Sequence, residues 1–130
     1  MHRSFLRTAL TVATLIATAA PALAQTLECT RTRLSSNGFG SNSTAESFFP
    51  THTAFRIDGD TVLGAPYGPG SVLRSEDRVT MTFPLLLSNG KTIPMRIRYN
   101  SANGRYAAQL LMPSGYIQNP GAGGRCRPRG

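Results

Sequence analysis

The sequence predicts an all-β fold, a small antiparallel β-barrel or β-sandwich of about six to eight strands in meander order. Two observations predict this fold class. Short runs that alternate apolar and polar residues recur along the chain, and turns rich in Gly, Pro, Asn and Asp separate them. Beyond residue 24, no run shows the periodicity of an amphipathic helix. These observations leave the choice between barrel and sandwich open.

The clearest strands flank the loop Ser101–Gly104, which consists of residues that favour turns. Pairing Asn100 with Arg105 brings the apolar residues of both strands opposite one another, whereas a shift by one residue would move them into water. We therefore predict a buried face with the cross-strand pairs Tyr99–Tyr106, Ile97–Ala108, Met95–Leu110 and Ile93–Met112.

A second hairpin turns at Asn89-Gly90, a sequence that favours a type I′ turn. Simple pairing out from this turn would place Phe83 opposite Arg96. One extra residue in the first strand restores apolar pairing, and Pro84 is tolerated at a bulge because it has no N–H to donate. We predict a β-bulge at Phe83–Leu85; an edge strand that ends at Pro84 is the alternative. The bulged register pairs Phe83 with Met95, Met81 with Ile97, and Val79 with Tyr99.

The remaining segments are assigned from β propensity and from Gly and Pro positions. Asp58–Asp60 is expected to be a hairpin turn and not a calcium site, since two carboxylates supply too few oxygens. The sequence further predicts strands at Thr26–Leu34, Thr53–Ile57, Thr61–Leu63, Ser71–Arg74 and Tyr116–Gln118, irregular connections at Ser35–Ser47 and Gly64–Gly70, and a flexible run at Gly121–Gly124.

Residues 1–24 have the features of a cleaved secretory signal peptide. Arg3 and Arg7 form a basic start, an apolar run follows, and Ala22-Leu23-Ala24 is a cleavage sequence of the A-x-A type. The apolar run is shorter than the ~20 residues that a membrane span requires. We therefore expect a periplasmic or secreted domain of residues 25–130, monomeric and without a membrane span.

The chain contains 2 cysteines, Cys29 and Cys126, close to the two ends of the predicted mature domain. An exported protein is exposed to oxidising conditions, in which an even number of cysteines favours a disulfide. We predict that these two residues are bonded to each other, and we expect no metal site and no cofactor.

Basic residues provide the main indication of a binding surface. The chain has 14 Lys and Arg against 6 Asp and Glu, a net charge of +8, and subtracting the two charges of Arg3 and Arg7 leaves +6. The predicted register places Arg78, Arg96 and Arg98 on the solvent face of the meander. Guanidinium groups there could bind an anion, or could serve only solubility. The Gly-rich loops, with the aromatic residues Phe39, Tyr67 and Tyr116, form a second candidate surface.

The mature domain contains one histidine, His52, so a small hydrolase would have to use it as the base. Ser47 and Asp58 are the corresponding candidates for nucleophile and orienting acid. No sequence motif of a hydrolase, a phosphate-binding loop or a dinucleotide site is present. We expect a protein that is not an enzyme, and the hydrolase using His52 is an alternative.

Pro113–Tyr116 resembles a Ser-Gly loop of periplasmic lysozyme inhibitors, which are small exported β proteins with a disulfide. The resemblance implies a second alternative, a protein inhibitor of a cell-wall hydrolase. Our main expectation is a binding protein that engages an anionic cell-envelope component, or a protein partner, through Arg78, Arg96, Arg98 and Tyr116. Nucleic acid is not expected as a physiological partner of an exported protein.

Overall fold

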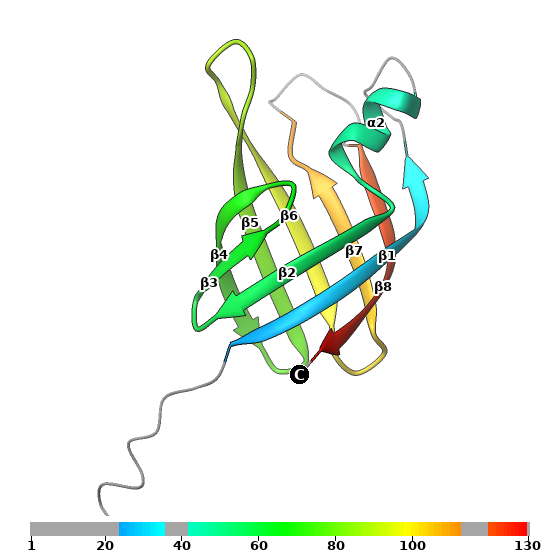
Figure 1. The fold of residues 1–130 in the computed structure, drawn as a ribbon, viewed down its shortest axis with the longest axis vertical. Coiled ribbons are helices and arrows are strands. Elements are labelled where there is room, and N and C mark those ends of the chain that lie inside the picture. Colours follow the sequence, from blue (N-terminus) through cyan, green and yellow to red (C-terminus); the bar gives the residue numbers. More distant parts are fainter. Residues whose placement is uncertain (1–23, 36–41, 113–119, 130) are drawn as a thin grey trace, which may run out of the picture.

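A computed structural model describes residues 24–35, 42–112 and 120–129 of the chain. In these residues, eight antiparallel strands follow one another around a closed barrel, and the last strand pairs with the first (Figure 1). The predicted all-β meander is confirmed, and the architecture is a barrel. The predicted signal peptide, apart from Ala24, and the predicted strand Tyr116–Gln118 lie outside the described residues.

The strands alternate between side chains that face the interior and side chains that face solvent. In β6, for example, Ile93, Met95 and Ile97 are buried, whereas Arg98 is exposed. The elements are β1 (Gln25–Ser35), α2 (Asn42–Phe48), β2 (His52–Asp58), β3 (Thr61–Gly64), β4 (Gly68–Ser75), β5 (Arg78–Leu86), β6 (Thr92–Asn100), β7 (Arg105–Leu110) and β8 (Gly121–Arg129).

The register around the Ser101–Gly104 loop is the predicted one. Asn100 pairs with Arg105, and Tyr99 pairs with Tyr106 on the buried face. The predicted pairs Ile97–Ala108 and Met95–Leu110 also form, and the ladder ends there because β7 ends at Leu110. The expected pair Ile93–Met112 is therefore not part of it.

The predicted bulge at Phe83–Leu85 is wrong, although the register it was meant to explain is right. Phe83 pairs with Met95, and the ladder continues without a break through Pro84–Pro94 to Leu86–Thr92. The extra residue lies in the turn instead. The Leu87 N–H donates to Lys91 O at 2.8 Å and the Gly90 N–H to Leu87 O at 2.9 Å, which leaves a three-residue loop.

Gly90 has a φ of 85°, and among the described residues only Glu76 is a non-glycine with positive φ. Asn89 therefore does not adopt the left-handed conformation that a type I′ turn would require of it. The arrangement is that of a turn followed by a bulged glycine, a common solution for three-residue hairpin loops. The extra residue that the sequence pattern placed near Pro84 therefore lies in the turn.

The expected irregular segment Ser35–Ser47 contains a short helix, α2, within its described part. Seven residues are too few for a stable isolated helix, so contacts with the barrel must hold it. Ala45 and Phe49 are buried. The Tyr67 hydroxyl donates to Phe48 O at 2.7 Å, and Arg31 Nη1 donates to Phe49 O at 2.5 Å. These contacts join residues that are far apart in the sequence, so the local sequence pattern does not indicate the helix.

The run Gly121–Gly124, expected to be flexible, belongs to strand β8. Two other strands approach it closely. A Cβ atom at Gly124 would lie 2.0 Å from Thr30 O, and one at Gly121 would lie 2.7 Å from Ala108 O. The glycines therefore permit close contact between β8 and its two neighbours, and only the closed barrel creates this requirement.

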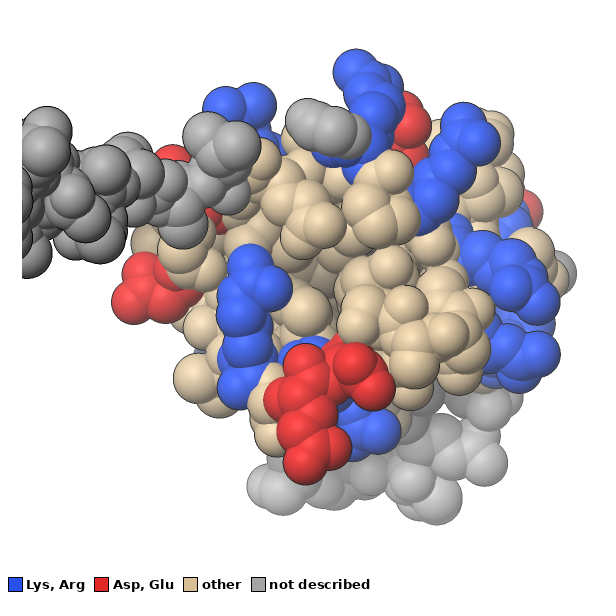
Figure 2. All heavy atoms as spheres, turned by 90° about the horizontal axis from the view of Figure 1, so that it is seen from below, with Lys and Arg blue, Asp and Glu red and all other residues tan. Residues whose placement is uncertain are grey.

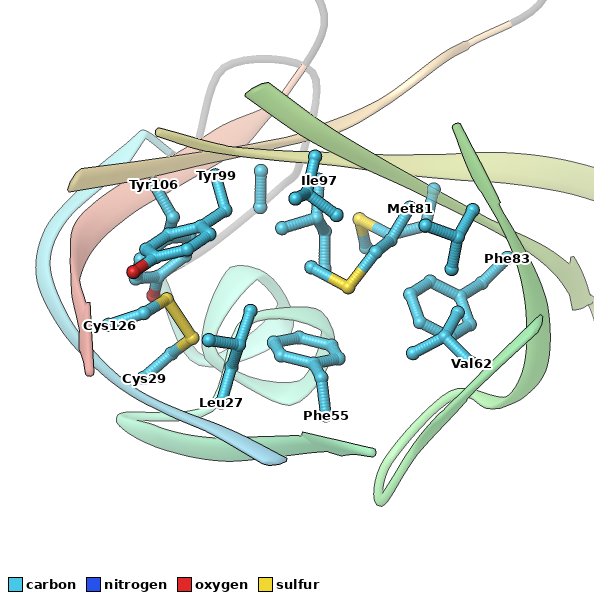
Figure 3. Packing of buried hydrophobic residues seen from close by; sticks show 14 of the residues in the cluster. Leu27, Cys29, Phe55, Val62, Met81, Phe83, Ile97, Tyr99, Tyr106 and Cys126 are labelled. Carbon is cyan, nitrogen blue, oxygen red and sulfur yellow. A yellow bond between two sulfur atoms is a disulfide. The ribbon is translucent and has the colours of Figure 1, made fainter. Parts of the chain in front are cut away.

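The barrel interior is filled by side chains, as expected for eight strands. Phe55, Tyr67 and Phe83 form an aromatic group, with ring centroids 5.3–6.2 Å apart. Figure 3 shows Phe55 and Phe83 together with Met81, Ile97 and Leu27 around the same space. The expected core residues Phe55 and Ile57 are each 1% exposed.

The predicted disulfide between Cys29 and Cys126 is present. The two residues are direct cross-strand partners in β1 and β8, and both face the interior (Figure 3). The bond therefore crosses the seam at which the barrel closes. It is compatible with an oxidising, exported location.

Removing the disulfide should destabilise the protein strongly. The two cysteines are 97 residues apart. For a loop of this length, the loss of chain entropy in the unfolded state corresponds to about 4–5 kcal/mol. We expect Cys29→Ala/Cys126→Ala to lower the free energy of unfolding by about this amount, as measured by urea denaturation. A change below about 1 kcal/mol would show that strand pairing alone closes the barrel.

Candidate anion-binding site

The three arginines predicted to form a binding surface lie on the outer face of neighbouring strands. Arg78 pairs with Asn100, Arg98 with Thr80, and Arg96 with Thr82 across the β5–β6 ladder. Arg78 and Arg98 are exposed. Arg96 is half-buried, and its Nη2 donates to Gln109 Oε1 at 3.3 Å, so its guanidinium is partly engaged.

Two further arginines, from β7 and β8, lie on this surface. Arg105 of β7 lies directly opposite Arg125 of β8, and both side chains are exposed. Like charges at directly opposed positions repel each other, since their Cβ atoms lie only ~4.5–5.5 Å apart. The pairing of Asn100 with Arg105 could have identified Arg105 from sequence, whereas its proximity to Arg125 depends on the β7–β8 contact.

A third added arginine, Arg33, reaches the same surface through a β-bulge in β1. Arg31 pairs with Gly124 and Arg33 with Gly123, so Thr32 is an extra residue. Bulges of this kind redirect the side chains that follow them. Arg31 lies before the bulge and bonds Phe49 O, whereas Arg33 lies after it and is exposed. Sequence parity alone would have placed both side chains on one face.

Small residues leave room for these arginines. Gly123 pairs with Ala107 on one side and with Arg33 on the other. A Cβ atom at Gly123 would lie 2.0 Å from Nη2 of Arg33, so the guanidinium group lies over the bare backbone of β8. We refer to this surface as the arginine face, formed by Arg33, Arg78, Arg96, Arg98, Arg105 and Arg125.

The arginine face has no acidic partner among the described residues. The salt bridge found in that part of the chain joins Arg129 to Glu28 at 2.7 Å and lies outside the face. Glu76 and Asp77 form the β4–β5 turn beside Arg78, without an ion pair to it. Figure 2 shows several Lys and Arg side chains gathered along one side of the lower end of the barrel. The largest acidic group lies on another part of the rim, with Lys or Arg atoms beside it.

A second group of polar residues lies inside the barrel, under helix α2. The hydroxyl of Tyr67 bonds Phe48 O, and the guanidinium of Arg31 bonds Phe49 O. Burial raises the pKa of Tyr67 above its usual value, and the nearby Tyr106 raises it further. Burial also raises the pKa of Tyr106, an effect that Arg31 and Arg33 oppose. Tyr67 is thus a structural residue and not the exposed aromatic contact that its loop position suggested.

The residues considered for a hydrolase are not brought together. His52 begins β2 and is exposed, whereas Asp58 ends the same strand. Six residues of extended chain separate these two by about 20 Å. The hydroxyl of Ser47 donates to Thr44 O within helix α2. A triad of Ser47, His52 and Asp58 is therefore excluded by this geometry.

The part of the chain that the structure describes contains no group of three or more His, Cys, Asp or Glu side chains suited to a metal ion. None of its helices has the length and apolar character needed to cross a membrane. Tyr116 and Phe39, expected as aromatic contacts in the Gly-rich loops, lie outside the described residues.

Comparisons with protein-family models, with curated proteins and with solved structures found no match to this chain. Its function must therefore be argued from the geometry of its own residues.

The raised pKa of Tyr67 predicts a stability that falls at high pH. An unfolded tyrosine ionises near pH ~10. The folded protein retains the Tyr67 proton to higher pH, so the free energy of unfolding should be constant below pH ~10 and should fall as the pH rises above it. Tyr67→Phe should reduce this fall, while costing about 1 kcal/mol at neutral pH through the lost hydrogen bond.

Urea denaturation of wild type and Tyr67→Phe between pH 8 and 11 measures both effects. Equal losses of stability in the two proteins across this range would contradict the role assigned to Tyr67.

Proposed function

We propose that this protein is a non-enzymatic binding protein of the periplasm or the secreted fraction, and that it engages an anionic cell-envelope component through the arginine face. The observation that supports this proposal is the convergence of six arginines from strands β1, β5, β6, β7 and β8 on one outer surface. Among the described residues, none of them has an acidic partner.

The chemistry of the arginine face suits an anionic ligand. Guanidinium groups are planar and remain charged, and they bind phosphate and carboxylate groups through paired hydrogen bonds. Arg105 and Arg125 repel each other across the β7–β8 ladder. A bound anion would attract both guanidinium groups and so offset this repulsion. The ligand is therefore expected to stabilise the folded state.

Two features support an exported location. The sequence of residues 1–24 has the charge, apolar run and cleavage sequence of a signal peptide. The Cys29–Cys126 disulfide is compatible with an oxidising compartment. Anionic ligands in such a compartment include the phosphate and carboxylate groups of cell-envelope polymers and lipids, and we do not propose nucleic acid as a partner.

Binding of a polyanion should raise the melting temperature in a salt-dependent manner. At a heparin concentration about ten times its Kd, we expect a rise of roughly 5–10 °C for wild type at low ionic strength. The rise should shrink at high salt, because exposed charges are then screened. The double variant Arg98→Ser/Arg105→Ser should lose most of it.

The matched control is Arg56→Ser/Arg74→Ser, which removes the same net charge from exposed positions on β2 and β4. This control should keep most of the wild-type rise in melting temperature. Equal rises in the two double variants would show that heparin senses only the net charge, and that the arginine face serves solubility.

A second candidate function, inhibition of a cell-wall hydrolase, is favoured by the shape of the β5–β6 hairpin. This hairpin projects beyond the end of the barrel in Figure 1, as a segment that enters a cleft would. Leu86, next to its turn, is 75% exposed. Exposed large apolar side chains at such a position suit a protein partner.

This alternative predicts that the protein slows the clearing of a peptidoglycan suspension by lysozyme. Leu86→Ser should weaken the inhibition at least tenfold, whereas Leu73→Ser, which changes a leucine that is also 75% exposed but lies on β4, should not. Clearing at the uninhibited rate with an excess of wild-type protein would exclude inhibition of lysozyme.

A further inference from the structure

We infer that the arginine face binds a ligand that carries two phosphate groups, one in each of two adjacent hollows that share Arg33 and Arg105. The inference rests on the proposed function and specifies the chemical class of the ligand.

Two surface hollows of about 240 Å³ each lie side by side on the arginine face. Arg33 and Arg105 line both of them and therefore stand between them. The first hollow extends over β5–β7 and is also lined by Arg78, Arg98 and Asn100. The second extends over the β8–β1 seam and is also lined by Thr32, Gly124 and Arg125.

Each hollow provides the groups that bind a phosphate. A phosphate displaces only a few water molecules of ~30 Å³ each, so either hollow has room for one. Arg98 and Arg78 supply guanidinium donors in the first hollow, with Asn100 as a neutral polar group. In the second hollow, Arg125 supplies a guanidinium and Thr32 a hydroxyl. Arg33 and Arg105 can donate to either side, since each guanidinium has five N–H groups.

The position of Arg33 is fixed by the backbone. The bulge at Thr32 turns Arg33 outward, and the absence of a side chain at Gly123 lets the guanidinium lie over β8. Arg105 is held next to it, opposite Arg125 and at the end of the turn that Gly104 completes with a φ of 73°. The strands thus fix the backbone positions from which both shared arginines extend before any ligand arrives.

Two linked phosphates should bind much more tightly than one. A single phosphate can occupy only one hollow, and it leaves the arginines of the other hollow without a counter-charge. When one phosphate of a bisphosphate is bound, the second is held close to the neighbouring hollow at a high effective concentration. Each added charge-assisted contact also relieves repulsion across Arg33 and Arg105.

The test compares fructose 1,6-bisphosphate, fructose 6-phosphate and inorganic phosphate by isothermal titration calorimetry at low ionic strength. We expect the bisphosphate to bind at least tenfold more tightly than either monophosphate. In Arg33→Gln, the Kd of the bisphosphate should rise to that of fructose 6-phosphate. Arg56→Gln, which removes the same charge from β2, should bind as wild type does.

The melting temperature of the free variants separates a folding defect from a binding defect. Arg33→Gln should melt at or above the wild-type temperature at low salt, because it removes repulsion from Arg105. A Kd for the bisphosphate within threefold of that for fructose 6-phosphate in wild type would overturn the inference, as would equal losses in Arg33→Gln and Arg56→Gln.

Vesicles of phosphatidylcholine with one fifth cardiolipin, which carries two phosphates, distinguish a lipid headgroup from a soluble ligand. If the sugar bisphosphate binds as expected, Arg33-dependent binding to the vesicles as well shows that a lipid headgroup also fits, and no binding to the vesicles points to a soluble ligand. Binding to neither overturns the inference. If heparin still raises the melting temperature through Arg98 and Arg105 while mono- and bisphosphate bind equally, the proposed function stands without this inference. If heparin has no effect either, both fail.

Discussion

The closure of the barrel between β1 and β8 is the constraint on which the rest of the structure depends. These strands come from the two ends of the described chain, and their pairing is the contact of longest range in the fold. Three features act together there: the Cys29–Cys126 bond, the glycine run of β8 and the bulge of β1. The bond restricts the unfolded chain, and the glycines let the two backbones approach. An eight-stranded barrel has no exposed sheet edge once this seam is closed.

The same seam also shapes the candidate site. Because β8 has glycine where a side chain would otherwise stand, the outer surface beside Ala107 is low, and Arg33 can lie across it. The bulge that places Arg33 outside leaves Arg31 inside, where it bonds a carbonyl just after helix α2. Because of the bulge, two arginines of the same sequence parity have different roles: Arg31 bonds Phe49 O just after helix α2, and Arg33 completes the arginine face.

Polar side chains inside the barrel differ from Arg105 and Arg125 on its outer surface in whether they have partners. Inside, Tyr67 and Arg31 have hydrogen-bond partners, and among the described residues no buried side-chain nitrogen or oxygen lacks one. On the arginine face, Arg105 and Arg125 lie opposite each other, and no described acidic residue forms an ion pair with either of them. In the described residues, the fold pairs its buried polar groups but leaves the repulsion between Arg105 and Arg125 without a neutralising charge. This repulsion is the physical basis for proposing an anionic ligand there. The projecting β5–β6 hairpin is a separate feature and supports a separate function.

The sequence by itself determined what local pattern and turn chemistry can determine. The alternation of Ile97 and Tyr99 with Arg96 and Arg98 fixed the faces of β6, and the loop before Arg105 fixed its register. The cysteines and the predicted export indicated the disulfide. The tertiary structure decided the position of Arg33, the helix at Ala45 and the strand at Gly121–Gly124. Each of these depends on a strand distant in sequence, because a bulge, a short helix and a glycine contact gain their stability only from the partner that packs against them.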